Sequence, residues 1–175
     1  MKDEIKVVLV DESDREIGTL EKLEAHRKGL LHRAISVFVF NNRKEWLLQQ
    51  RAADKYHCPG LWTNTCCTHP LPHESYRTAA ERRVREEMGF EPVLTEQFRF
   101  IYRAELDHDL IEHELDTVFT GISDTIPSPC PEEVSSFRYL STTELDREIA
   151  EHPARFTPWF LKMYPRVKQL LTGEE

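Results

Sequence analysis

The stretch Ser75–Gly89, with the sequence SYRTAAERRVREEMG, is the clearest structural signal in the chain, because it predicts a helix over Ser75–Met88. One face of this helix is apolar, since four residues recur at every fourth position: Tyr76, Ala80, Val84 and Met88. Gly89 then ends the helix. Arg83 and Glu87 also lie four residues apart and share a face. Carboxylates at the end of such a helix can hold Mg²⁺, whereas the same spacing also fits ion pairs on a solvated surface.

Strand patterns dominate the chain on both sides of this helix. The predicted strands are Ile5–Val10, Ala34–Phe40, Trp46–Gln50, Phe98–Leu106, Ile111–Thr120 and Phe137–Leu140. Turn residues Asn41–Lys44 and Asp107–Asp109 join two pairs of these strands as hairpins. The mixed order of helices and strands predicts the α+β class, a mixed sheet with flanking helices in a single domain over residues 1–175.

The C-terminal part of the chain carries helix signals. Ser141–Glu144 has the spacing of a capping box and opens a predicted helix that runs to about Glu151. Thr157–Pro158 opens a last helix, which Pro165 is expected to kink or interrupt. Ile126–Pro131 holds three prolines and predicts a surface loop inside the domain.

Composition and charge narrow the function classes. Hydrophobic residues make up 39% of the 175 residues and charged residues 31%, which is typical of a globular protein with a real core. The net charge of −8 argues against nucleic acid or an anionic membrane as a partner. No apolar run is long enough to span a bilayer and no export signal is visible, so the expected location is the cytoplasm. The oligomeric state is not predicted.

The chain has four cysteines: Cys58, Cys66, Cys67 and Cys130. Two of them are adjacent, which does not suit a disulfide framework. Cys67 and His69 lie two residues apart and would point to one face of an extended chain, whereas Cys66 would point to the other. A thiol beside an imidazole suits acid–base chemistry or metal binding, and simple packing is the alternative. Packing is the expected role of Cys66.

Histidines and glutamates are spaced as in a metal site. Glu112 and Glu114 would share one face of a strand, so their carboxylates would converge. Together with His26, His32 and His69 they would form a site for a divalent metal ion, Mn²⁺ or Zn²⁺. The alternative is a solvated strand face, with histidines that lie on the surface or in the core.

Basic residues form a further group: Lys22, Arg51, Lys55 and Arg83. They could surround a diphosphate, because a guanidinium offers a fork to phosphate oxygens and an ammonium group a point charge. The alternative is ordinary charge at the surface that keeps the protein in solution.

The charged helix and the residue before it resemble the Nudix box, which combines a Gly, a Glu and a terminal Arg-Glu-aliphatic-x-Glu-Glu-x-Gly motif. Glu74, Arg82 and Glu86–Phe90 match this pattern. The chain departs from it at Thr68, where Gly is expected, and at Arg83, where the first Glu of the terminal motif is expected. The missing carboxylate is a metal ligand in that box, so the departure argues against ordinary Nudix diphosphate hydrolysis.

All these motifs together resemble one family closely, the type I isopentenyl-diphosphate delta-isomerases, which have the Nudix fold. The shared strings lie between about residue 18 and residue 160: Gly18–Lys22, His26, Leu31–His32, Arg51–Ala52, Lys55, Pro59–Gly60, Trp62–Asn64, Cys67, His69–Pro70, Glu74–Ser75, Arg82–Arg83, Glu87, Gly89, Tyr102–Ala104, Glu112, Glu114, Phe156 and Pro158–Trp159. Cys-x-His-Pro followed by Glu-x-Glu is the specific part of the pattern. The departures from the Nudix box are those that this isomerase family shows.

The resemblance implies that the chain isomerises isopentenyl diphosphate to dimethylallyl diphosphate. One proton is added at one end of an allylic unit and another is removed on the opposite face. Cys67 and Glu114 would be the acid–base pair, and Tyr102 would hold Glu114 on the expected donor side. Trp159 would stabilise the cationic intermediate with its ring face. Which of the two groups donates the proton is left open.

The resemblance also implies two divalent metal ions. The Mn²⁺ or Zn²⁺ ligands would be His26, His32, His69, Glu112 and Glu114. A Mg²⁺ ion would bridge the substrate diphosphate to Glu87 and Cys67, beside the cations Lys22, Arg51, Lys55 and Arg83. Two other functions remain as alternatives: a Nudix hydrolase that acts on a nucleoside or other diphosphate, and a metal-binding protein without catalysis.

Overall fold

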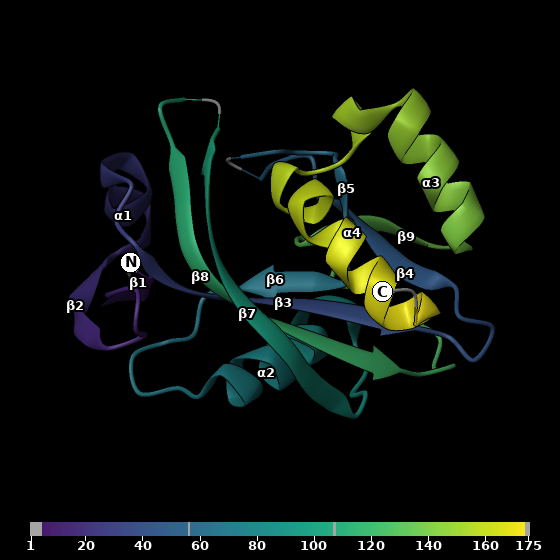
Figure 1. Cartoon of the computed structure of the whole chain (residues 1–175), viewed down its shortest axis with the longest axis horizontal. Coiled ribbons are helices and arrows are strands. Elements are labelled where there is room, and N and C mark those ends of the chain that lie inside the picture. The colour runs from purple at the N-terminus through teal and green to yellow at the C-terminus, as the bar shows by residue number, and fades with distance from the viewer. Residues whose placement is uncertain (1–4, 56, 107, 174–175) are drawn as a thin grey trace.

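Nine strands and four α-helices make up the computed structural model over its described residues, 5–55, 57–106 and 108–173 (Figure 1). The strands are β1 (Lys6–Val10), β2 (Glu16–Glu21), β3 (His32–Phe40), β4 (Trp46–Arg51), β5 (Trp62–Thr63), β6 (Cys66–Thr68), β7 (Leu94–Glu105), β8 (Ile111–Ile122) and β9 (Val134–Leu140). The helices are α1 (Lys22–Lys28), α2 (Tyr76–Met88), α3 (Thr142–Glu151) and α4 (Pro158–Thr172), with a 3-10 turn at Pro153–Arg155. The predicted α+β class, a mixed sheet with flanking helices, is confirmed.

Strand β3 lies inside the sheet, with a strand paired along each of its edges. Strand β8 pairs with it in parallel, with His32 opposite Glu114. Strand β6 pairs with its other edge in the antiparallel sense, with Ser36 opposite Cys67. Strand β7 continues the sheet beyond β8 and places Tyr102 opposite Glu114. Residues that are far apart in the sequence therefore become neighbours on one sheet.

Helices cover both faces of this sheet (Figure 1). Helix α2 covers one face with Ala80, Val84 and Met88, which are all fully buried. Helix α4 covers the other face, where Trp159 and Phe160 join the core. Complete burial of a large apolar side chain contributes about 1.5–3 kcal/mol. The apolar face predicted for α2 is confirmed, and the sheet is the middle of three layers.

The end of α2 is fixed by a glycine and by the proline-rich loop. Gly89 has a φ of +73°, and a Cβ atom at this position would clash with the carbonyl oxygen of Ser128. The Ser128 amide donates to the carbonyl of Met88 at 2.9 Å, and the Cys130 amide donates to that of Glu87 at 2.9 Å. The loop therefore docks on the C-terminal turn of α2.

Several short elements and the last helix differ from the sequence-based expectation. Strands β2, β5 and β6 and helix α1 were not predicted. The predicted interruption of α4 at Pro165 is wrong, since the helix continues to Thr172. Pro165 lies on the exposed side, while Met163 and Val167 stay buried on the side that faces the core. The stability gained by burying that face outweighs the loss of the one backbone hydrogen bond that proline cannot donate.

Asp107, the first residue of one predicted turn, lies outside the described residues. No helix in the described part is long and apolar enough to cross a membrane.

Candidate active site

One cavity holds most of the residues predicted for the site. Its polar and aromatic lining consists of Lys22, Ser36, Arg51, Lys55, His57, Cys67, Thr68, His69, Arg83, Glu87, Tyr102, Glu112, Glu114 and Trp159. Two further predicted residues, His26 and His32, are buried next to His69, with ring centroids 5.4 and 5.0 Å from its ring. The fold thus brings all the predicted site residues into or beside a single cavity.

A cluster of three histidines and one glutamate lies at one end of the cavity, and we call it the histidine end. One nitrogen or oxygen atom from each of His26, His32, His69 and Glu114 lies within 4.8 Å of the others. Glu112, the fifth predicted ligand, falls outside this group. Its carboxyl group lies 3.0 Å from the Tyr102 hydroxyl and 3.6 Å from a nitrogen of His57.

Backbone contacts fix the tautomers of two of these histidines. His26 Nδ1 lies 2.6 Å from the carbonyl of Lys22, and His32 Nδ1 lies 2.7 Å from that of Leu30. A carbonyl only accepts, so both Nδ1 atoms carry the proton and each Nε2 keeps a lone pair. Within the described residues, both Nε2 atoms are buried without a hydrogen-bond partner. Metal-binding histidines are typically oriented in this way, so the cluster fits a divalent metal ion.

Burial sets the charges at the histidine end. It lowers the pKa of His26 to about 4 and that of His69 to about 3, so both rings are neutral at pH 7 and available as ligands. Burial also acts to raise the pKa of Glu114, but the hydrogen bond from His69 and the nearby ring of His32, 3.6 Å away, outweigh it and hold that pKa well below its usual range. Burial and the charge of Glu114 raise the pKa of Glu112 well above its usual range. One carboxyl group of the pair is therefore ionised and the other is neutral.

The two adjacent cysteines face opposite sides of the sheet, as the spacing predicted. Cys66 is fully buried in the core beneath α2. The sulfur of Cys67 lines the cavity, 3.1 Å from the side-chain nitrogen Nδ2 of Asn64 and 3.5 Å from the hydroxyl of Ser36. Burial, followed by the carboxylate of Asp116, raises the pKa of the Cys67 thiol. The thiol is therefore neutral at pH 7.

A phenol lies between the two carboxyl groups in the cavity that Cys67 also lines. The Tyr102 hydroxyl lies 2.7 Å from a carboxylate oxygen of Glu114 and 3.0 Å from one of Glu112. Burial raises the pKa of Tyr102 well above its usual range, so the phenol is protonated. Trp159 is 3% exposed, and its ring centroid lies 5.7 Å from that of His57. The polar groups are thus combined with an aromatic wall.

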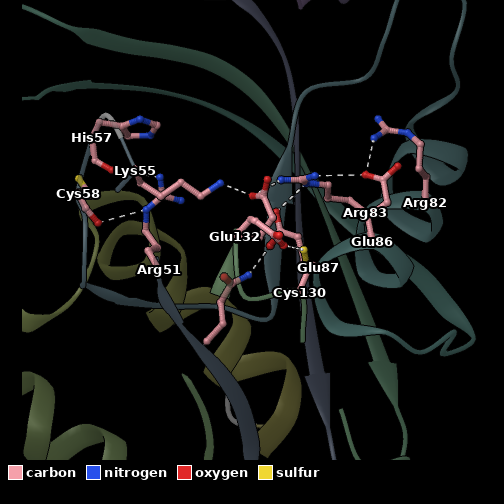
Figure 2. Close-up of polar contacts among 12 residues, drawn as sticks. Arg51, Lys55, His57, Cys58, Arg82, Arg83, Glu86, Glu87, Cys130 and Glu132 are labelled. Carbon is pink, nitrogen blue, oxygen red and sulfur yellow. Dashed lines mark hydrogen bonds and ion pairs between the residues drawn. The ribbon is translucent and has the colours of Figure 1, made fainter. Parts of the chain in front are cut away.

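The four predicted cations line the cavity near a set of carboxylates, and we call this region the cationic end. Figure 2 shows three of these cations, Arg51, Lys55 and Arg83. Arg83 forms ion pairs of 2.6 Å with both Glu87 and Glu133. Gln49 donates to the second oxygen of Glu87 at 2.6 Å. Lys55 pairs with Glu133 as well. The predicted shared face of Arg83 and Glu87 is confirmed.

The other two cations are held differently. Arg51 donates to the carbonyls of His57 and Cys58 at 3.1 and 3.2 Å (Figure 2). Its guanidinium lies 5.3 Å from the ring centroid of Trp159. Burial lowers the pKa of Lys22 to about 8, so this lysine is still mostly protonated at pH 7. The region can therefore offer both fixed guanidinium groups and ammonium groups to an anion.

Three groups in or near the cavity were missed by the sequence analysis. His57 lies in a loop, where no regular spacing marks it. Glu133 follows the proline-rich loop and is identified only by its contacts with two cations. Asp116 continues the alternation of Glu112 and Glu114 along β8, so its spacing was a usable signal. Burial and Glu114 raise the pKa of Asp116 to about 8.

Comparisons with known proteins agree with this geometry. A family model described as NUDIX domain matches residues 30–160. The isopentenyl-diphosphate Delta-isomerase of Pectobacterium atrosepticum is 51% identical over 162 residues, which cover 93% of this chain and 90% of the relative. Isopentenyl-diphosphate Delta-isomerase 1 of Aromatoleum aromaticum is 48% identical over 164 residues, which cover 94% of this chain and 93% of the relative. A crystal structure of a Deinococcus radiodurans protein superposes with a TM-score of 0.70 at 22% identity, over 84% of this chain and 90% of that one.

Proposed function

Because the chain belongs to the isopentenyl-diphosphate Delta-isomerase family, whose members have the NUDIX domain, we propose that it converts isopentenyl diphosphate to dimethylallyl diphosphate. One observation carries the proposal. A thiol and a phenol–carboxylate pair reach the same cavity from strands that lie on opposite edges of β3. The double-bond shift needs an acid and a base on opposite faces of a small allylic unit, and Cys67 and Glu114 meet that need.

We assign proton donation to the side of Glu114 and Tyr102, and proton removal to Cys67. An alkene is a very weak base, so the donor must be held rigidly near the double bond. The contacts of the Tyr102 hydroxyl with both carboxyl groups, at 2.7 and 3.0 Å, supply that rigidity. The intermediate is a tertiary carbocation, and the ring face of Trp159 would attract it while the buried wall excludes water.

The structure has the protonation state that would follow a forward turnover, not the one that would begin it. Cys67 is a neutral thiol and Glu114 is ionised. The proposed reaction leaves this state behind, because the proton has then moved from the Glu114 side to Cys67. The same state begins the reverse reaction. A new forward turnover therefore requires the protonation of the two sides to be reset.

The histidine end would hold a divalent metal ion through His26, His32, His69 and Glu114, and Glu112 remains the predicted fifth ligand. The unpartnered Nε2 atoms of His26 and His32 support this assignment. Nitrogen and oxygen donors together favour Mn²⁺ or Zn²⁺. When bound, such an ion supplies positive charge beside Glu114 and restricts the orientation of its carboxylate. The chain itself fixes the rings through the backbone carbonyls described above.

The cationic end would bind the diphosphate of the substrate. Its four cations are Lys22, Arg51, Lys55 and Arg83. By the family resemblance, Glu87 and Cys67 would hold Mg²⁺ at this end, and its positive charge would favour binding of the diphosphate. Buried Glu87 is an oxygen ligand of the kind that Mg²⁺ prefers, and it lies among the same cations. The cationic end would thus anchor the substrate, and the reaction would take place near Cys67 and Glu114.

A single assay tests the function. The protein is incubated with isopentenyl diphosphate and Mg²⁺, and both dimethylallyl diphosphate and released phosphate are measured. We expect isomerised product without phosphate, whereas phosphate release would favour a Nudix hydrolase.

Cys67→Ala should abolish turnover, while Cys66→Ala keeps most of it, because Cys66 lies in the core on the far side of the sheet. An equal loss in both variants, with intact folding, would contradict the role of Cys67.

A further inference from the structure

Glu133 forms ion pairs with two cations of the cavity, and the proposed reaction gives Glu133 no role. One of its carboxylate oxygens forms ion pairs with Lys55 and with Arg83, the latter at 2.6 Å. Both cations line the cavity, where they belong to the proposed diphosphate site. Glu133 is not among the residues that line the cavity; it lines a neighbouring groove that shares both cations with the cavity. A carboxylate thus neutralises two diphosphate-binding cations from outside.

The backbone of Glu133 is anchored on two sides. Its carbonyl accepts a hydrogen bond from the Ala52 amide at 3.0 Å, close to Lys55 in the chain. Its own amide donates to the carbonyl of Cys130 at 3.0 Å, and the Cys130 amide donates to the carbonyl of Glu87 at 2.9 Å. The turn therefore links the segments that carry the two cations. The side chain of Glu133 is the part that can move away.

The charge of Glu133 makes it a competitor for a phosphate group. Burial acts to raise its pKa, but Lys55 and Arg83 outweigh this effect and hold that pKa below its usual range, so the group is ionised at pH 7. A carboxylate oxygen shared by two cations makes the same kind of contact as a phosphate oxygen. A diphosphate that binds these cations must therefore weaken their contacts with Glu133.

We propose that Glu133 is a built-in counter-ion that sets the affinity of the cationic end for diphosphates by competing for Lys55 and Arg83. This inference rests on the function proposed above, because it assumes that the two cations bind the substrate diphosphate. The counter-ion keeps the cations paired before the substrate arrives. It also weakens the hold on the product, which carries the same diphosphate. The competition is for charge and not for space, since Glu133 does not line the cavity.

The test is the binding of inorganic pyrophosphate, measured by calorimetry in a buffer with Mg²⁺. Glu133→Gln removes the charge and keeps the shape. Exposed or half-buried ion pairs each shift an equilibrium by up to about fivefold, so we expect pyrophosphate to bind about three- to tenfold more tightly to this variant. Glu132→Gln is the matched control. Glu132 is exposed and lines the same groove, and its carboxylate accepts from Cys130. Its removal should change the affinity by less than about twofold.

The possible outcomes separate the two proposals. If the wild-type protein binds pyrophosphate and Glu133→Gln binds it equally or more weakly, the counter-ion role is wrong and the isomerase function stands. Equal tightening in both variants would mean a general effect of net charge and would also overturn the role. If the wild-type protein does not bind pyrophosphate, the diphosphate site itself fails. Thermal unfolding confirms the fold of each variant. If Glu133→Gln does not fold, Glu133→Asp replaces it in the test. Its shorter side chain keeps the charge but weakens the contacts with Lys55 and Arg83, so pyrophosphate should bind more tightly than to the wild-type protein, by a smaller factor than expected for Glu133→Gln.

Discussion

The two ends of the cavity prepare for charged ligands in opposite ways. At the histidine end, burial keeps His26 and His69 neutral, and the Nε2 atoms of His26 and His32 have no hydrogen-bond partner within the described residues. At the cationic end, Arg83 and Lys55 are already paired with carboxylates. The histidine end offers nitrogen lone pairs that make no hydrogen bond, and these can bind a cation. The cations of the other end must give up a carboxylate partner before they bind another anion. The two ends should therefore respond differently to substitution, to metal ions and to pH.

The largest effect should come from the carboxyl pair at the histidine end. Glu114→Gln keeps the shape and an oxygen ligand but removes the group that takes part in proton transfer. General acid–base catalysis contributes about 10²–10⁴-fold, and unassisted alkene protonation is very slow, so turnover should fall by about 10⁴-fold or more. Glu112→Gln should act through weaker metal binding and be partly restored by excess Mn²⁺. Turnover of both variants across a Mn²⁺ titration separates the roles. Equal restoration of both would reduce Glu114 to a ligand and make Tyr102 the next candidate for the acid.

Metal removal should distinguish the two ends by stability. A metal ion at 100 times its dissociation constant stabilises the folded state by about 2.7 kcal/mol, or about 5–10 °C in Tm for a chain of this size. We expect Mn²⁺ to raise the Tm of the chelator-treated wild-type protein and of Glu87→Gln by this amount. His26→Gln should lose most of the rise, because a ligand of the histidine end is gone. Thermal unfolding with and without Mn²⁺ measures it, and full stabilisation of His26→Gln would exclude His26 as a ligand.

The smallest effect concerns pH at the histidine end. Two histidines with an ordinary pKa near 6.5 would be mostly protonated at pH 5.5, and together they would weaken metal binding about 100-fold. The lowered pKa values of His26 and His69, about 4 and about 3, keep both rings neutral there. Mn²⁺ affinity should therefore fall by less than about tenfold from pH 7 to pH 5.5. Calorimetric titrations at both pH values measure the change, and a 100-fold loss would contradict the effect of burial.

The sequence predicted the long elements better than the short ones. Helix α2 and the hairpin of β3 and β4 carry regular apolar spacing, and the structure contains both. Strand β2 and helix α1 do not. Helix α1 has seven residues, of which only Ala25 and His26 are buried, and its N-cap is the side chain of Glu21. Such a short helix depends on tertiary contacts for its stability, and its sequence contains no repeat of apolar residues at helical spacing.

The site shows the same limit. Spacing alone correctly separated Cys67 from Cys66, because alternation along a strand depends only on the local backbone. The meeting of His26 on α1 with Glu114 on β8 depends on contacts between distant segments, so the residue types suggested a shared metal site but the spacing could not place it. Glu133 gave no signal, since its significance lies in cations that come from two other segments.

The parallel pairing of β3 with β8 has a consequence for the order of folding. His32 and Glu114 face each other across this pairing, although about 80 residues separate them in the chain. Closing so long a loop is slow, and the four-residue metal cluster does not exist before it closes. A metal ion that binds only the completed cluster cannot accelerate this step. It should instead slow the reverse process, and so lengthen the lifetime of the native state without changing the rate at which the chain reaches it.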